Sequence, residues 1–275
     1  MKDPYQSLAT DLAERRCIVI AGLPGTGKSL AVRELARRAS AIGRKPHLLQ
    51  WDIVRGAWDT EENLARFPEI DGVTHPCIRK ALGIWVRPTV ARWLRDHETV
   101  NDLLIIEAPL VGGRFAELAY CAEDALEPSL TSKDVLFLVL VPSRRLQQEL
   151  RRRRGEESSP GQEDLEKRNA IVSVLDATVA ALERVAPALG ITPSTPGSYD
   201  PKLLLDVMQA ALRHRSLRAL HLDEVIDTAG SVYDLGNGVT QIEAERGDIA
   251  VSMQRAAALD QDRLRQDLEL RWACT

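Results

Sequence analysis

The chain has 275 residues, 44% of them hydrophobic, and a formal net charge of −4. This length and composition can bury a substantial core, whereas the slight negative charge argues against a broad basic surface for nucleic acid. No stretch reaches the roughly 18 apolar residues of a membrane span, and the amino terminus lacks the apolar core of a signal peptide. The four cysteines form no Cys-x-x-Cys pair, so we expect a cytoplasmic protein with reduced thiols and no membrane partner.

The first predicted strand, residues 17–21, leads into a glycine-rich stretch that fits the phosphate-binding pattern Gly-x4-Gly-Lys-Ser/Thr. The stretch is Gly22-Leu23-Pro24-Gly25-Thr26-Gly27-Lys28-Ser29. Apolar residues then recur at helical spacing until Gly43, so strand, glycine loop and helix follow one another as such a site requires. We expect the loop N–H groups to surround a polyphosphate, the Lys28 amine to neutralise its β and γ phosphates, and the Ser29 hydroxyl to ligate Mg2+. The pattern predicts a site for a nucleoside triphosphate. We expect ATP, and no base-reading motif distinguishes it from GTP.

The second predicted strand, residues 47–51, is followed by Asp52 and then by Arg55. Ligands of open parallel sheets bind beyond the carboxyl ends of the strands, so residues that close a strand are site candidates. We expect the Asp52 carboxylate to take the proton of an acceptor hydroxyl that attacks the γ phosphate, and Arg55 to hold a phosphate or carboxylate of that acceptor. The alternative is that Asp52 caps the next helix and Arg55 is its solvated partner.

The segment 56–102 is long for a simple crossover, and we expect it to bind the acceptor. It includes a predicted helix over residues 90–97. Trp51 and Trp58 flank Asp52 and could stack on a ring, although core packing explains a single aromatic residue more often. None of the five histidines has partners at metal-ligand spacing, so the sequence indicates no transition-metal site.

The third predicted strand, residues 103–106, ends in Glu107, where an acidic residue usually contacts Mg2+ directly or through water. The alternative is a strand-end acid that binds no metal. Gly112-Gly113-Arg114 follows, and Arg114 is a candidate for facing the acceptor. A helix is predicted over residues 115–126.

An arginine-rich helix over residues 144–154 follows the fourth predicted strand, residues 135–141, and leads into a polar, turn-rich loop. Most of its arginines are expected on a solvated face. Phosphoryl transfer needs cations around the moving group, so we expect a lid over about 144–168 in which Arg152 and Arg153 brace the phosphate.

The rest of the chain is predicted to contain helices over 170–189 and 201–215, a fifth strand over 219–222, and an amphipathic helix over 241–272. The apolar face of that last helix is Ile249, Met253, Ala257, Leu264 and Leu268. It either docks on the parent domain or forms a homodimer contact. We expect a main domain over 1–230 and a helical extension over 231–275.

Together, the loop 22–29, Asp52-x-x-Arg55 and the arginine-bearing lid resemble the P-loop kinases, and within them the polynucleotide kinase and zeta-toxin-like group. The resemblance covers about residues 15–227. It implies a three-layer α/β fold with a five-stranded parallel sheet of order 2-3-1-4-5. It also implies that Asp52 is the base, that Arg55 contacts the acceptor, and that lid arginines brace the transferring phosphate. The loop is also close to that of AAA+ ATPases, but Glu107 is followed by Ala108-Pro109 instead of completing their Asp-Glu pair.

Two functions follow as expectations. The first is a kinase that transfers the γ phosphate of Mg-ATP to a hydroxyl of a small molecule, nucleoside or nucleotide. The second is a regulatory P-loop NTPase that acts as a nucleotide switch on a protein partner. A kinase for nucleic-acid ends is a weaker third, because the acidic chain shows no basic track.

Overall fold

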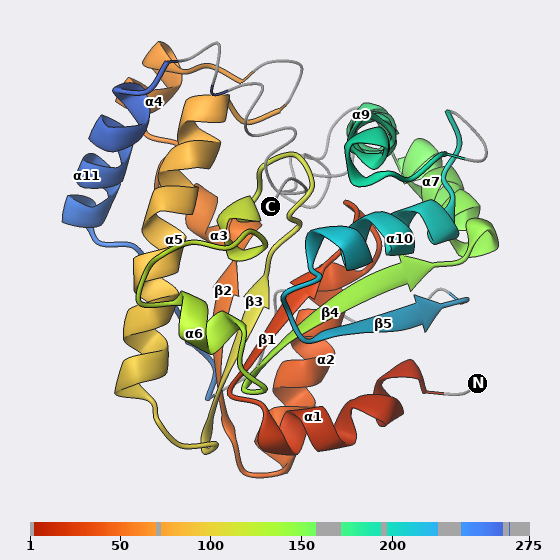
Figure 1. Cartoon of the computed structure of the whole chain (residues 1–275), viewed down its shortest axis with the longest axis horizontal. Coiled ribbons are helices and arrows are strands. Elements are labelled where there is room, and N and C mark those ends of the chain that lie inside the picture. Colours follow the sequence, from red (N-terminus) through yellow and green to blue (C-terminus); the bar gives the residue numbers. More distant parts are fainter. Residues whose placement is uncertain are drawn as a thin grey trace.

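A single parallel sheet of six strands forms the centre of the protein in the computed structural model (Figure 1). The structure describes residues 3–69, 73–157, 172–193, 197–224, 238–260 and 264, without the side chains of 153–157 and 172–175. The strands are β1 (Cys17–Ala21), β2 (Lys45–Gln50), β3 (Asp102–Glu107), β4 (Val135–Pro142), β5 (Leu217–Leu222) and β6 (Thr240–Gln241). Their order is β5-β4-β1-β3-β2-β6, and each neighbouring pair is parallel.

The predicted α/β class with a parallel sheet is confirmed, but the predicted count of five strands is wrong. The five predicted strands are neighbours in the order β2-β3-β1-β4-β5, and β6 adds a sixth strand beyond β2. Thr240 and Gln241 pair with His47 and Leu48. A two-residue strand leaves no periodic pattern in the sequence, so only this long-range pairing identifies it.

Helices cover both faces of the sheet. Alternate strand residues therefore lie in two separate buried clusters. In β1, Cys17, Val19 and Ala21 belong to one cluster, and Ile18 and Ile20 belong to the other. Helices α5 (Pro76–Asp96), α9 (Val172–Val185) and α10 (Pro201–Ala211) contribute to the first cluster, whereas α1 (Ala9–Glu14) and α2 (Lys28–Ala41) contribute to the second. The architecture therefore has three layers.

The other helical elements are short or flank these layers. They are η1 (Pro4–Leu8), α3 (Trp51–Arg55), α4 (Glu61–Arg66), η2 (Ala116–Leu118), α6 (Glu127–Leu130), α7 (Arg144–Glu157), η3 (Ala186–Leu189) and α11 (Arg246–Ala257). None of the described helices combines the length and the apolar character that a membrane crossing requires.

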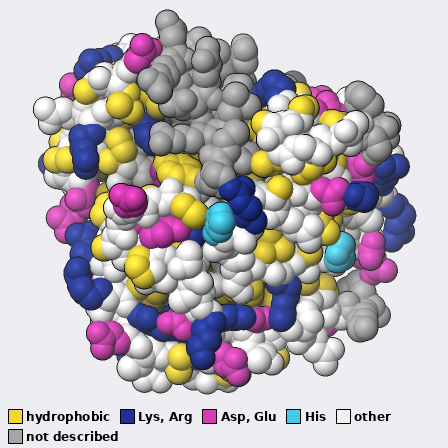
Figure 2. Space-filling view, in the orientation of Figure 1, with side chains coloured by type: hydrophobic (Ala, Val, Ile, Leu, Met, Phe, Trp, Pro, Cys, Tyr) yellow, Lys and Arg dark blue, Asp and Glu magenta, His cyan; other side chains and the backbone are white. Residues whose placement is uncertain are grey.

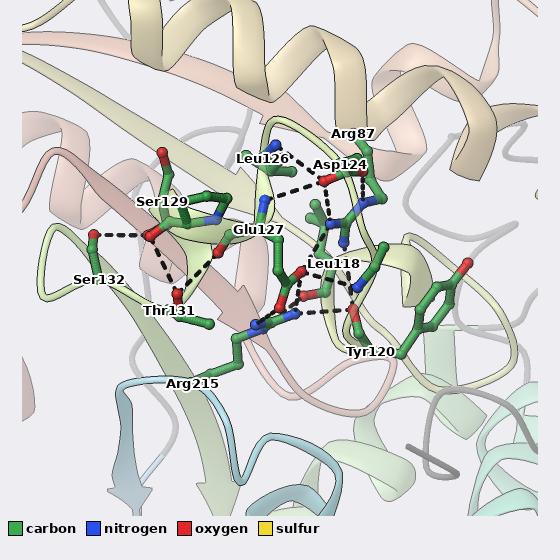
Figure 3. A network of polar contacts seen from close by, with 12 residues as sticks. Arg87, Leu118, Tyr120, Asp124, Leu126, Glu127, Ser129, Thr131, Ser132 and Arg215 are labelled. Carbon is green, nitrogen blue, oxygen red and sulfur yellow. Dashed lines mark hydrogen bonds and ion pairs between the residues drawn. The ribbon is translucent and has the colours of Figure 1, made fainter.

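The predicted helix over 115–126 is wrong, because only the single turn η2 forms there. The carbonyl groups that would bond along a helix are bound by guanidinium groups instead, as Figure 3 shows in part. Arg215 donates to the carbonyls of Leu118 (3.3 Å) and Tyr120 (2.9 Å), and Arg87 donates to the carbonyl of Glu117 (2.5 Å). These partners come from distant segments, so the local pattern could not reveal them.

The predicted helix over 90–97 is the final part of the longer α5. This helix begins at Pro76, because the side chain of His75 accepts a hydrogen bond from the Cys77 amide (3.1 Å) and caps its first turn. The long segment 56–102 thus supplies α4 and α5.

The carboxy-terminal helix α11 begins at Arg246, five residues later than the predicted start at 241, where β6 lies instead. It packs beside α5 (Figure 1). The indole N–H of Trp58 donates to the Ser252 hydroxyl (3.0 Å), and that of Trp85 donates to the Asp248 carboxylate (3.3 Å). Of the predicted apolar face, Ile249, Met253, Ala257 and Leu264 pack against the core of the same chain, and Leu268 lies outside the described residues.

Candidate functional site

The glycine-rich loop 22–29 connects the end of β1 to the start of α2, as predicted. Gly22, Gly25 and Gly27 have φ angles of 147°, 74° and 85°, which L side chains rarely adopt. A Cβ on Gly22 would also lie 3.2 Å from the carbonyl oxygen of Leu140. The Thr26 hydroxyl donates to the Leu23 carbonyl (2.9 Å) and closes the turn. The glycines are therefore required by the backbone path of the loop.

Lys28 and Ser29 begin α2 and reach two different partners. The Lys28 side chain is buried, and its amine donates to the carbonyl oxygen of Leu23 (2.9 Å) within the loop. The Ser29 hydroxyl lies 3.3 Å from each carboxylate oxygen of Glu107, at the end of β3. The structure thus brings the loop together with the acidic residue predicted from the third strand.

Glu107 is a buried carboxylate, with 3% of its surface exposed. Burial raises the pKa of Glu107, and the nearby charge of Asp52 raises it further, while Lys28 and two hydrogen bonds oppose the shift. One of those bonds comes from the Gln50 amide, 3.1 Å away. Sequence analysis missed Gln50, whose polar side chain at the end of an apolar strand was the available signal. The Glu107 carboxylate and the Ser29 hydroxyl are hard oxygen ligands of the kind that Mg2+ prefers.

Asp52 lies in the first turn of α3, immediately after β2. The N-cap of α3 is Gln50, so Asp52 does not cap this helix as the alternative interpretation required. Its partly exposed carboxylate forms no hydrogen bond or ion pair with any described residue. Its charge acts on both Glu107 and Arg114. Asp52 is thus a carboxylate without a side-chain partner among the described residues, near Glu107 and Arg114.

Arg55 points to the segment between α3 and α5. Its guanidinium donates to the Thr74 hydroxyl (2.8 Å) and to the Glu69 carboxylate (2.9 Å), and it lies 3.3 Å from the Asp59 carboxylate. The predicted contact between Arg55 and an acceptor remains a prediction, but this guanidinium already has three protein partners. It is not the partner of Asp52.

Arg152 is exposed on α7, where its guanidinium pairs with the Glu149 carboxylate (2.8 Å). The side chain of Arg153 lies outside the described residues, as does the part of the predicted lid that follows residue 157. The other described arginines of this run contact polar groups of the protein: Arg144 with Asp200 (3.3 Å), Arg145 with the Asp223 carbonyl (2.9 Å) and Arg151 with Asp176 (2.5 Å). Bracing of a phosphate by Arg152 and Arg153 stays a prediction.

Trp51 and Trp58, which flank Asp52, are both buried. The ring of Trp51 meets that of Phe115 edge-on at 5.0 Å, and the ring of Trp58 meets that of Trp85 at 5.2 Å. These residues form the core, so core packing is the correct interpretation of the two aromatic residues.

A groove of about 910 Å³ runs between η1, the outer face of α2 and β5. Leu30, one residue after Ser29, and Arg33 line one side of it, and the carboxyl end of β5 lines the other. Its volume lies within the range of small-molecule sites. The residues that line this groove include none of the predicted site residues.

Basic and acidic side chains are interspersed over the described surface on the face shown in Figure 2. No protein-family model matches the chain, and a search of curated proteins finds no match either. The geometry of the described residues is therefore the basis for a functional proposal.

Proposed function

We propose that the protein transfers the γ phosphate of Mg-ATP to a hydroxyl of a small molecule, nucleoside or nucleotide, with Asp52 as the general base. One observation carries the proposal: the Asp52 carboxylate has no described protein partner and lies near Glu107, which the Ser29 hydroxyl of the loop contacts. A structural carboxylate normally has hydrogen-bond donors, whereas a general base must be available to the proton that it accepts.

The residues present fit both ATP and Mg2+. The loop offers backbone N–H groups at the start of a helix of 14 residues, an arrangement that favours phosphate. The buried Glu107 carboxylate has a raised pKa, and a bound cation would stabilise its ionised form. The adjacent Ser29 hydroxyl would supply a second oxygen ligand for Mg2+. When bound, Mg2+ would offset the charge that develops between the β and γ phosphates.

In the proposed reaction, the Lys28 amine leaves the Leu23 carbonyl and binds the phosphates of ATP. The Asp52 carboxylate accepts the proton of the acceptor hydroxyl as its oxygen forms a bond to the γ phosphorus. The bond between that phosphorus and the β–γ bridging oxygen breaks, and ADP leaves. A correctly placed base of this kind contributes about 10²–10⁴-fold to the rate.

The proposal is tested by measuring ADP formation from Mg-ATP with pooled nucleosides, nucleotides, sugars, small alcohols and 5′-hydroxyl oligonucleotides. We expect one pool to stimulate ADP formation. Lys28→Ala should abolish it, and Asp52→Asn should lower it about 10²–10⁴-fold while ATP binding persists. The matched controls are Lys202→Ala and Asp260→Asn, which alter exposed residues.

Two outcomes would contradict the proposal. Full turnover by Asp52→Asn would exclude Asp52 as the base. Slow hydrolysis that no pool stimulates, and that only Lys28→Ala abolishes, would favour the alternative of a regulatory NTPase, and nucleotide-dependent assembly with a protein partner would then be measured.

A further inference from the structure

Arg114 is a cation without a protein partner at the edge of the proposed site. Its partly exposed guanidinium forms no hydrogen bond or ion pair with any described residue. Burial lowers the pKa of Arg114, whereas the charge of Asp52 raises it and that of Arg55 lowers it. An arginine stays charged under these conditions, so Arg114 is a cation within range of the Asp52 charge but without a hydrogen-bond partner among the described residues.

The loop that carries Arg114 has an unusual backbone. Leu110 and Phe115 have φ angles of 64° and 57°, in the left-handed region that non-glycine residues rarely adopt. Gly112 and Gly113, between them, have φ angles of 73° and 74°. The Leu110 amide donates to the Arg114 carbonyl (2.9 Å), which closes the loop. Such strain persists only where the surroundings hold the backbone in place, and it concentrates at functional sites.

Two contacts fix this loop relative to Asp52. The Phe115 ring packs edge-on against Trp51, the residue that precedes Asp52. On the other side, the Arg79 guanidinium from α5 donates to the Gly112 carbonyl. Arg114 lies between these two anchored positions in the chain, and the charge of Asp52 acts on its guanidinium.

We propose that Arg114 binds an anionic group, a phosphate or a carboxylate, on the molecule whose hydroxyl Asp52 deprotonates. This inference rests on the proposed function and narrows the acceptor to an alcohol that already carries a negative charge. Arg55, the acceptor ligand implied by the resemblance, is occupied by Glu69, Thr74 and Asp59. Arg114 offers the planar, two-pronged donor set that phosphate and carboxylate accept.

The test compares matched acceptors that differ only in charge: ribose with ribose 5-phosphate, and glycerol with glycerol 3-phosphate and with glycerate. We expect the anionic members to stimulate ADP formation more strongly. Arg114→Gln should lower kcat/KM for them about tenfold to a hundredfold and leave that of the neutral members unchanged. Arg213→Gln, at an exposed arginine that follows α10, is the matched control. A higher kcat/KM for the phosphate-bearing acceptors than for glycerate would identify phosphate as the group that Arg114 binds.

A binding measurement separates failure of this inference from failure of the kinase proposal. Inorganic phosphate is titrated by calorimetry into protein saturated with Mg-ADP, so that the loop 22–29 is occupied. We expect phosphate binding that Arg114→Gln abolishes and Arg213→Gln retains. Equal phosphate binding by wild type and Arg114→Gln, or none by either, would overturn the inference even if acceptor-dependent ADP formation is found. Arg114-dependent phosphate binding without such ADP formation would overturn the kinase proposal alone.

A second, independent cluster lies at the opposite edge of the sheet, where β2 and β3 begin. His47 of β2, His97 at the end of α5 and Asp102 of β3 each offer one ligand atom within 4.8 Å of the others. The Nε2 atom of His47 lies 2.9 Å from the Asp102 carboxylate. The spacing of these three residues in the sequence does not predict the cluster, because they come from three separate elements.

The surroundings of the cluster favour metal binding. The Nδ1 atom of His97 lies 3.0 Å from the Trp93 carbonyl, which only accepts hydrogen bonds, so Nδ1 carries the proton and Nε2 keeps its lone pair. The ring of His97 also stacks on Trp93 at 4.4 Å, which fixes its orientation. Metal-ligating histidines usually have such a carbonyl partner on the other ring nitrogen. We infer that His47, His97 and Asp102 bind a divalent transition metal such as Zn2+, for which two imidazoles and a carboxylate are suitable ligands.

This second inference is tested with Co2+ and Zn2+ added to chelator-treated, dialysed full-length protein. We expect a visible Co2+ absorption band that one equivalent of Zn2+ removes. His97→Gln should lose the band, and His214→Gln, an exposed histidine, should keep it. Circular dichroism verifies that both variants are folded. No band with wild type, or an unchanged band with folded His97→Gln, would overturn the inference.

Discussion

Two groups of buried or partly buried charges in this protein differ in how completely they are paired. In the first, around Arg87 and Arg215, every cation has two or more acceptors (Figure 3). In the second, at the carboxyl ends of β2 and β3, Asp52 and Arg114 have no hydrogen-bond partner among the described residues, and the buried Glu107 has a raised pKa.

The paired group joins three distant segments. Arg87 of α5 donates to both carboxylate oxygens of Asp124 (2.6 and 2.7 Å) and to Glu127 (2.9 Å). Arg215, which precedes β5, is completely buried and donates to Glu127 (2.6 Å) and to the Tyr120 carbonyl (2.9 Å). Partial burial alone raises the pKa of Glu127, but the hydrogen bonds from Arg215 and Arg87 outweigh it and bring the pKa to about 2.

The arginines and carboxylates that pair with one another stabilise the fold, whereas those without protein partners are the candidates for function. Charges that satisfy one another hold the segment 115–130 against α5 and β5, and they leave nothing available for a ligand. Charges that lack such partners reduce the stability of the folded chain, because a buried unpaired charge is unfavourable. Their presence at the carboxyl edge is explained if a ligand supplies the missing partners.

The largest effect is expected in the paired group. Arg215→Ala removes one of the two guanidinium donors of Glu127 and the buried donor of the Leu118 carbonyl, and it should reduce the free energy of unfolding by about 3–5 kcal/mol. The nearby exposed residue Arg213 provides the control, since Arg213→Ala should change the free energy of unfolding by less than about 0.5 kcal/mol. Denaturant unfolding measures both. Similar values for the two variants would show that the network is not a major source of stability.

The pH dependence of stability tests whether Glu127 is ion-paired in the folded protein. The pKa of Glu127 in the folded protein is about 2, below its ordinary value of 4.5, so the folded state favours the ionised form. The stability that this carboxylate contributes is present above pH 4.5 and is lost as the pH falls toward 2. Glu127→Gln should therefore destabilise the protein most near neutral pH and converge with wild type in acid. A difference that does not depend on pH would contradict the assignment.

Glu107, at the carboxyl ends of β2 and β3, should change stability with pH in the direction opposite to Glu127. Burial raises the pKa of Glu107, so its contribution to stability falls as the pH rises above the ordinary value of 4.5. Glu107→Gln removes the buried charge and should stabilise the metal-free protein by about 1–3 kcal/mol at neutral pH. The same variant should lose the Mg2+ dependence of ATP binding. A metal-free variant less stable than wild type would mean that Glu107 has a structural role.

The smallest effect is expected where α11 packs on the main domain. Ser252→Ala removes the acceptor of the Trp58 indole N–H and should cost about 1 kcal/mol of stability. Binding of Mg-ATP should not change, because the contact belongs to the packed core. Weaker ATP binding by this variant would show that α11 is coupled to the site.

Local patterns predicted the fold and the loop well, because each depends on neighbouring residues. The apolar run of β1, the glycines of loop 22–29 and the helix start at Lys28 are all encoded within about twenty residues. Glu107 was found because it ends an apolar strand. These features combine a local periodicity with a general rule about the edge of a parallel sheet.

Features that depend on long-range pairing could not be predicted in this way. Gln50 reaches Glu107 only because the two are opposite each other in the register of β2 and β3. The side-chain partners of Arg55 come from residues 4 to 19 positions away, and those of Arg215 come from 88 to 97 positions away. Whether an arginine is paired or available therefore becomes evident only in three dimensions.

The most direct test of the central claim is calorimetric titration of Mg-ATP into wild type, Lys28→Ala and Lys202→Ala. The unpaired edge is a triphosphate site if wild type and Lys202→Ala bind one equivalent of Mg-ATP and Lys28→Ala does not. Equal affinity of all three proteins, or no binding by wild type, would contradict the account.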